Sequence, residues 1–157
     1  MEKARAEKIA TEIIDLYRKH GGDDYIGENV TQLQHAFQSA AHAKAQNCDD
    51  EMVLAAFLHD IGHICVAEHN VAKMDGFGVM NHEKIGAAFL RMRRFSDRLV
   101  KLVQAHVSAK RYLTYKDEFY FNRLSEASRQ TIQQPDHYLQ HVQMVLVFQF
   151  LHLLYDH

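Results

Sequence analysis

The sequence predicts an all-α protein built as a helical bundle. Apolar residues recur at helical spacing through most of the chain, and strand-like alternation of apolar and polar residues is absent before residue 130. Histidine also recurs at near-equal spacing: His35, His59, His82 and His106 are separated by 24, 23 and 24 residues. Each interval is about one helix with its connection, so successive helices would bring one histidine each to a shared centre.

Composition favours one globular domain and excludes several classes of partner. The 157 residues are 47% hydrophobic and 24% charged, which is ordinary for a soluble protein. The net charge of -2 provides no basic surface for nucleic acid or anionic lipid. The charged N-terminus has no apolar signal segment, and no apolar run is long enough to span a membrane. Cys48 and Cys65 lack metal-type pairing and fit a reducing compartment, so we expect a cytoplasmic protein.

The first two helices are predicted from an apolar stripe and a capping signal. Residues 3–20 carry apolar side chains on one face, and a Gly-Gly-Asp-Asp turn ends this helix. The second helix begins near Thr31, which has capping-box spacing to Gln34. In this helix we expect Phe37 to point into the core beside His35. The other inward residues are Leu33, Ala40 and Ala41.

The third predicted helix, residues 50–61, is apolar on nearly all sides and should be central and buried. Residues 47–50 end the preceding helix and cap this one. The adjacent pair His59-Asp60 lies at its C-terminal end, just before Gly62. This placement puts the pair where the chain turns.

The remaining body of the chain is predicted as a loop and two helices. Residues 62–80 are expected to form the loop. Asn81 is a suitable N-cap for a helix that begins with His82, and Ser96 is a suitable N-cap for a helix that carries His106. With the first three helices, these complete the predicted bundle.

The end of the chain differs from the body. All 18 Lys and Arg residues lie in the first 129 residues, and the following segment is rich in apolar, β-prone side chains. We therefore divide the chain into a domain of residues 1–132 and an atypical C-terminal tail of residues 133–157. The tail is either part of that domain or appended to it.

The His-Asp pair and its three partners predict a metal centre. Neighbouring residues on a helix point about 100° apart, so His59 and Asp60 reach one ion only at the end of the helix. The two oxygens of Asp60 could bridge two ions, the first held with His35 and His59 and the second with His82 and His106. Imidazole and carboxylate suit iron, manganese or zinc. Two metals together could orient a substrate and activate water or O2.

The run Phe57-Leu-His59-Asp60-Ile-Gly62-His63 resembles the core of the HD-domain superfamily of metal-dependent phosphohydrolases. Two further segments are far more specific: Asp24-Tyr25-Ile26-Gly27-Glu28 and the stretch from His106 to Tyr115. The stretch from Leu124 to Ser128 also matches. These resemble the mixed-valent di-iron oxygenase subfamily, similar to 2-amino-1-hydroxyethylphosphonate dioxygenase. The resemblance covers roughly residues 9–132 and implies an HD-domain helical bundle.

The resemblance implies a function and roles for single residues. It implies two Fe ions in a mixed-valent pair, with Mn or Co as the alternative, and O2-dependent cleavage of the carbon–phosphorus bond of a small hydroxyphosphonate. Tyr25 resembles the tyrosine that occupies an iron position until substrate arrives, and Glu28 resembles the residue that stabilises this state. The side chains implied to hold the phosphonate are His63, Lys110, Ser128 and Thr131.

The resemblance ends where the composition changes. The family has one more aspartate ligand to the first metal, on a late helix. Asp136 lies too early for that role, and Asp156 has different surroundings. The sequence thus suggests a frameshifted or otherwise replaced C-terminus, which would leave the first metal short of a ligand.

Two other functions stay open at the level of sequence. One is a phosphohydrolase that uses Mn²⁺, Co²⁺ or Fe²⁺ to activate water against a small phosphate ester or nucleotide. The other is an inactive remnant, favoured by the missing aspartate. Tyr25 with Glu28 favours the oxygenase, because hydrolysis does not need a displaceable tyrosine.

Overall fold

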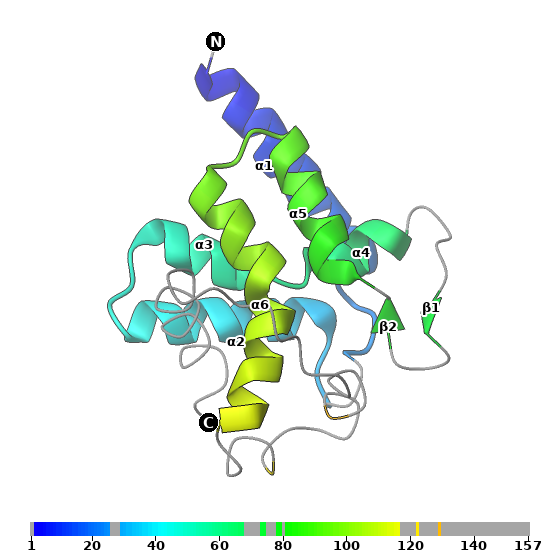
Figure 1. Cartoon of the computed structure of the whole chain (residues 1–157). Helices are drawn as coiled ribbons and strands as arrows, with labels where there is room; N and C mark the ends of the chain where they lie inside the picture. Colours follow the sequence, from blue (N-terminus) through cyan, green and yellow to red (C-terminus); the bar gives the residue numbers. More distant parts are fainter. Residues whose placement is uncertain are drawn as a thin grey trace.

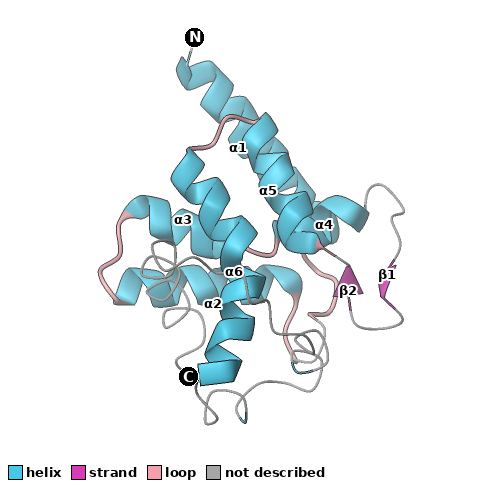
Figure 2. Cartoon of the chain, viewed as in Figure 1, coloured by secondary structure: helices cyan, strands magenta, loops and turns pink. Residues whose placement is uncertain are grey.

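Six helices and one short hairpin make up the part of the chain that the structure describes (Figure 1). This computed structural model describes residues 2–25, 29–67, 73–74, 78–79 and 81–116, together with residues 122 and 129. The elements are α1 (Glu2–His20), α2 (Gln32–Ala45), α3 (Asp50–Leu58), α4 (Ile61–Ala67), β1 (Lys73–Met74), β2 (Gly78–Val79), α5 (His82–Met92) and α6 (Asp97–Lys116). Helices dominate the described part (Figure 2), so the predicted all-α fold is confirmed.

Helix α1 supports the end of α3, where the His-Asp pair begins. Ile13 and Tyr17 are buried in the core, as the apolar stripe predicts. The Tyr17 hydroxyl donates a hydrogen bond of 3.1 Å to the carbonyl oxygen of Phe57, and the two rings are in contact. The last four carbonyls of a helix have no partner within the helix. Tyr17 therefore satisfies one of them, two residues before His59.

Helix α2 begins as predicted, but Phe37 and Ala41, both expected to point inward, are exposed. Thr31 accepts a hydrogen bond from the Gln34 backbone, and the Gln34 side chain accepts one from the Thr31 backbone, so the capping box is confirmed. Phe37 was expected in the core, and this prediction is wrong, because the side chain is 60% exposed. The buried face of α2 carries His35, Ala36, Ser39 and Ala43. Phe37 lies off this face, and its ring meets that of Phe57 edge to face.

The chain after α3 differs from the prediction. Asp49 caps α3, its carboxylate accepting a 2.8 Å hydrogen bond from the Met52 backbone. The helix ends at Leu58 and not at residue 61 as predicted, and a second helix, α4, continues to Ala67, although a loop was expected from residue 62. Helix α4 has only seven residues, five of them buried, and it packs against α5. Short helices are stabilised mainly by tertiary packing, which leaves no local signal in the sequence.

The same segment contains a hairpin that was not predicted. Strands β1 and β2 pair antiparallel, with Lys73 opposite Val79 and Met74 opposite Gly78. Two residues per strand are too few for a period of alternation to be visible in the sequence. The hairpin leads directly into the start of α5.

Helices α5 and α6 form an antiparallel pair that begins at the predicted caps. Asn81 precedes α5 with φ of 57°, in the left-handed region, but its side chain does not cap the helix. Its amide oxygen instead accepts a 3.1 Å hydrogen bond from Lys84 Nζ. Ser96 caps α6 as predicted, its hydroxyl accepting from the Leu99 backbone at 3.1 Å. The core lies between α3, α4, α5 and α6, and its largest fully buried apolar side chains are Leu58, Ile61, Ile64, Leu90, Leu99 and Val103.

Some predictions concern parts of the chain that the structure does not describe. The atypical tail of residues 133–157 lies outside the described residues, so the proposed domain division stays a prediction. Among the helices described, none combines the length and the apolar character needed to cross a membrane.

Candidate metal centre

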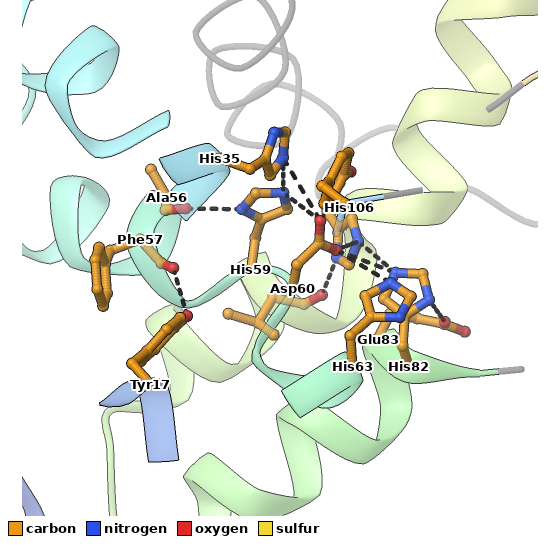
Figure 3. A network of polar contacts seen from close by, with 12 residues as sticks. Tyr17, His35, Ala56, Phe57, His59, Asp60, His63, His82, Glu83 and His106 are labelled. Atoms are coloured by element: carbon orange, nitrogen blue, oxygen red, sulfur yellow. Dashed lines mark hydrogen bonds and ion pairs between the residues drawn. The ribbon is translucent and has the colours of Figure 1, made fainter. Parts of the chain in front are cut away.

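The histidines that recur along the sequence meet at one place (Figure 3). His35 comes from α2, His59 and Asp60 from the turn after α3, and His106 from α6. His82 is the first residue of α5. Asp60 lies between the imidazoles and is nearly inaccessible, with 8% of its surface exposed. Four segments thus bring their polar side chains together in the middle of an apolar core.

The two oxygens of Asp60 divide the surrounding side chains into two groups. Oδ2 lies 3.0 Å from His59 Nε2 and 3.6 Å from His35 Nε2. Oδ1 lies 3.2 Å from His82 Nε2 and 3.3 Å from His106 Nε2. This division matches the predicted assignment of one histidine pair to each ion, with Asp60 shared between them.

The spacing within each group fits two ligands of one ion. His35 Nε2 and His59 Nε2 are 3.2 Å apart, and His82 Nε2 and His106 Nε2 are 3.0 Å apart. Two atoms that bind one ion at about 2.1 Å and at right angles lie about 3.0 Å from each other. Both pairs are therefore spaced as neighbouring ligands, and His35, His59 and Asp60 together could hold a metal.

The protonation of the rings also suits metal binding. His59 Nδ1 lies 2.7 Å from the Ala56 carbonyl oxygen, and His106 Nδ1 lies 2.7 Å from the Val103 carbonyl oxygen. A carbonyl oxygen only accepts, so Nδ1 carries a proton in both rings, and Nε2 is the nitrogen left to bind a metal. Lone pairs and carboxylate oxygens facing each other at these distances repel unless a cation lies between them.

Burial keeps these groups in the charge states that bind metal. It lowers the pKa of His35 to about 3, helped by the neighbouring His59, and it lowers the pKa of His106. Burial alone would raise the pKa of Asp60, but the nearby imidazoles of His59, His106 and His82 hold that pKa well below its usual range. At neutral pH the carboxylate is charged and these two rings are neutral, so a metal ion need not compete with their protons.

His63, on α4, lies at the edge of the centre. Its Nε2 is 3.9 Å from Asp60 Oδ1, and its ring stacks on that of His82 with centroids 4.0 Å apart. Burial and the neighbouring His82 lower its pKa to about 3. With Asp60 and His82 it forms a second group that could hold an ion. The resemblance had implied contact with substrate instead, and both roles fit this position.

The two low histidine pKa values predict that the metal-free protein is sensitive to acid. His35 and His63 titrate near pH 3 when folded but near 6.5 when unfolded, so below pH 6.5 the unfolded chain binds more protons. From pH 7 to pH 5, each histidine should lower the free energy of unfolding by about 2 kcal/mol. Asp60 does not offset this loss, because its own contribution is lost only below pH 3.8.

Urea unfolding of chelator-treated protein at pH 7 and pH 5 would measure this dependence. His63→Gln should remove about half of the difference, because glutamine does not titrate. Equal pH dependence in the two proteins would contradict the assignment of His63 as a buried neutral ring.

Two of the other predicted site residues lie in the described part of the chain, and three lie outside it. Lys110 lies one turn after His106 on α6 and is 8% exposed, so it is not a surface lysine, and its charge contributes to the lowered pKa of His35. Tyr25 reaches the centre, donating a 3.0 Å hydrogen bond to Asp60 Oδ2. Three residues lie outside the described part of the chain: Glu28, Ser128 and Thr131.

Sequence reasoning misses one acidic residue beside the centre. Glu83 Oε2 lies 3.9 Å from His82 Nδ1, on the side of the ring away from Asp60. The only signal for Glu83 in the sequence is its place directly after a predicted ligand.

Comparison with known proteins supports the resemblance inferred from the sequence. The HD domain family matches residues 32–137. The chain is 45% identical over 120 residues to an uncharacterized protein of Acanthamoeba polyphaga mimivirus, covering 76% of this chain and 55% of the relative. It is 37% identical over 128 residues to [1-hydroxy-2-(trimethylamino)ethyl]phosphonate dioxygenase (glycine-betaine-forming) of Leisingera caerulea, covering 82% of this chain and 64% of the relative.

A third relative is similar at the same level. The chain is 37% identical over 131 residues to hydroxymethylphosphonate dioxygenase of Gimesia maris, covering 83% of this chain and 64% of the relative. The matches thus span between 55% and 64% of the length of these relatives. The predicted resemblance to the HD-domain superfamily and to hydroxyphosphonate dioxygenases is confirmed.

Proposed function

We propose an oxygenase function for this chain, which belongs to the HD domain family. The reaction would be O2-dependent cleavage of the carbon–phosphorus bond of a small hydroxyphosphonate, with two iron ions held around Asp60. Similarity to two proteins named as hydroxyphosphonate dioxygenases supports this choice. The division of four histidines between the two oxygens of Asp60 supports a centre for two ions.

The observation that carries the proposal is the position of Tyr25. Its hydroxyl lies 3.0 Å from Asp60 Oδ2, the oxygen that also faces His35 and His59. Its ring stacks on His35 with centroids 3.8 Å apart and planes 13° from parallel. The phenol therefore adds an oxygen donor to the group of the first ion. In a hydrolase, water would occupy the position of the Tyr25 hydroxyl. In the proposed oxygenase, the tyrosine would shield the first iron until substrate displaces it.

The residues of the chain have separable tasks in this reaction. Bound iron would supply one-electron transfer with O2. Asp60 and the four histidines would fix the positions of the two ions, and Lys110 would balance the negative charge of the phosphonate. Hydroxymethylphosphonate and O2 would yield formate and phosphate. In that reaction the carbon–phosphorus bond breaks, the carbon is oxidised to a carboxylate, and both atoms of O2 are found in the products.

A direct test compares oxidation with hydrolysis on the same protein. The protein is loaded with Fe²⁺ without air and then mixed with O2 and hydroxymethylphosphonate or [1-hydroxy-2-(trimethylamino)ethyl]phosphonate. We expect O2 uptake and phosphate release in equal amounts, and no phosphate without O2. Tyr25→Phe should bind iron but consume O2 before substrate is added, because the displaceable hydroxyl is lost.

The alternative is a phosphohydrolase, and one observation favours it. His63 is a neutral ring beside Asp60 Oδ1 and could accept a proton from an attacking water. Release of phosphate from p-nitrophenyl phosphate with Mn²⁺ and without O2, and no reaction with either phosphonate, would replace the oxygenase proposal. A chain that binds no metal at all would instead fit an inactive remnant.

Lys110 offers a test of substrate binding that leaves the metal ligands in place. We expect Lys110→Met to weaken phosphonate binding about 10- to 100-fold, because a charge-assisted contact in a buried site contributes about 1.5–3 kcal/mol. Iron content should not change. Calorimetric titration of the iron-loaded protein with phosphonate, without O2, would measure this loss. Lys101→Met is the matched control, because Lys101 is on the same helix and is exposed. Equal losses in the two variants would show that Lys110 does not contact the substrate.

A further inference from the structure

Two side chains hold consecutive carbonyls at the end of α3 (Figure 3). His59 Nδ1 lies 2.7 Å from the carbonyl oxygen of Ala56, and the hydroxyl of Tyr17 donates a hydrogen bond of 3.1 Å to the carbonyl oxygen of Phe57. The first contact gives a predicted ligand an outer partner, and such partners set the tautomer and the direction of metal-binding histidines. The second contact comes from α1 and holds the next peptide group along the chain.

Tyr17 has little freedom to move away from this carbonyl. Its side chain is buried, and the centroid of its ring lies 4.9 Å from that of the Phe57 ring. Burial raises the pKa of the Tyr17 hydroxyl above its ordinary value, and the nearby charge of Asp60 raises it further. The hydroxyl therefore keeps its proton at neutral pH and remains a hydrogen-bond donor to Phe57.

The contact joins parts of the chain that are far apart in sequence. Tyr17 lies 40 residues before Phe57. Helix α1 also packs against α4, which begins directly after the His-Asp pair. Helix α1 therefore supports His59 and Asp60 from both sides, before the turn through Tyr17 and after it through α4.

We propose that Tyr17 is a positioning residue of the candidate metal centre, because its hydroxyl holds the end of α3 that leads into His59 and Asp60. These two residues are among the three ligands predicted for the first ion. His59 Nε2 lies 3.0 Å from Asp60 Oδ2 and 3.2 Å from His35 Nε2. Metal ligands must be held to within about 0.5 Å, so a small change in the direction of the chain after α3 would weaken binding of that ion. This inference rests on the proposed metal centre.

The effect of Tyr17 should be larger on the Oδ2 side of Asp60 than on the Oδ1 side. On the Oδ2 side, His59 and Asp60 both follow Phe57 within three residues. On the Oδ1 side, the two histidines belong to α5 and α6, so only Asp60 depends on the end of α3. Tyr17 would therefore act mainly on the first ion.

A purely structural role makes a different prediction. In that case, loss of the Tyr17 hydroxyl would lower the free energy of unfolding equally with and without metal, and metal affinity would not change. Ser96→Ala is the matched control, because it also removes one hydroxyl, the cap of α6 that accepts from the Leu99 backbone at 3.1 Å. Its loss should cost comparable stability. Ser96 lies ten residues before His106, about 15 Å along the helix.

The experiment titrates Fe²⁺ binding without air in two backgrounds that each keep one side of the centre. His82→Ala keeps the Oδ2 side, and His35→Ala keeps the Oδ1 side. Tyr17→Phe and Ser96→Ala are made in both, and phenylalanine keeps the ring of Tyr17 while removing only its hydroxyl. We expect Tyr17→Phe to weaken Fe²⁺ binding about 3- to 10-fold with His82→Ala and less than about 2-fold with His35→Ala, as loss of one hydrogen bond predicts. Ser96→Ala should change neither affinity.

Amide hydrogen exchange of the chelator-treated protein gives a second measurement, which needs no metal. The His63 backbone N–H donates to the Asp60 carbonyl oxygen at 3.0 Å, so its exchange rate reports how firmly the turn is held. We expect this rate to increase more in Tyr17→Phe than in Ser96→Ala.

Each other result counts against the proposal in a distinguishable way. Unchanged Fe²⁺ affinity in Tyr17→Phe, or an equal loss in the two backgrounds, would overturn the positioning role while the metal centre stands. Equal exchange rates at His63 in Tyr17→Phe and Ser96→Ala would do the same. A wild-type chain that binds no iron would overturn the proposed function, and this inference with it.

Discussion

Asp60→Ala is expected to remove metal from both sides of the centre. The Asp60 carboxylate contacts all four predicted histidine ligands and supplies the only negative charge between the two pairs among the described residues. Without it, each pair retains two imidazoles, which bind a divalent ion weakly and provide no negative charge to balance it. The loss of affinity should exceed the 10- to 100-fold that removal of an outer partner costs.

The measurement is iron per chain after loading without air, followed by gel filtration. The wild type should hold up to two irons and Asp60→Ala close to none. His82→Ala is the control, because it leaves His35, His59 and Asp60 intact and should lose only one iron. The double variant His59→Ala with Asp60→Ala should behave as Asp60→Ala does. Full iron content in Asp60→Ala would show that the metal, if bound, does not lie at this carboxylate.

Local features of the sequence predicted where helices start and which histidines lie together around Asp60. Thr31, Asp49 and Ser96 cap their helices through contacts within three residues, so their chemistry is visible in a short window. The histidine spacing likewise predicted which rings lie close together around Asp60, while their role as metal ligands stays a prediction. Histidines that recur once per helix and connection lie at similar heights along neighbouring helices, so their rings can meet. The pair His59-Asp60 indicates the height at which they meet.

Features that depend on packing between helices were missed. Phe37 is apolar and lies on α2, but the buried face of this helix is formed by His35, Ala36, Ser39 and Ala43, and Phe37 is exposed. Helix α4 has only seven residues, and its packing against α5 stabilises it. Glu83 looks like an ordinary acid at the start of a helix. Its place beside His82 Nδ1 depends on the turn made by Asn81, and the sequence does not reveal the left-handed backbone there.

Gly62→Ala is expected to disturb both the fold and one side of the centre. A Cβ at Gly62 would lie 1.9 Å from the His82 carbonyl oxygen, 2.7 Å from its carbonyl carbon and 3.0 Å from the Gly86 nitrogen. All three atoms are backbone, so no side-chain rotation relieves the overlap. Helices α4 and α5 must separate, at a cost of about 3 kcal/mol or more in the free energy of unfolding.

The separation should act unevenly on the two histidine pairs. His82 begins α5 and would move with it, whereas no atom of His35 or His59 is among the three heavy atoms nearest to a Cβ at Gly62. We therefore expect Gly62→Ala to weaken one of the two iron-binding steps and to lower the urea midpoint of the chelator-treated protein. Gly22→Ala is the matched control, because nothing lies within 4 Å of a Cβ there and its stability should change little. If Gly62→Ala matched the wild type in both measurements, the close contact of α4 with α5 would not be what places His82 against Asp60. In the structure this contact, made possible by a residue without a side chain, joins the His-Asp turn to the second histidine pair.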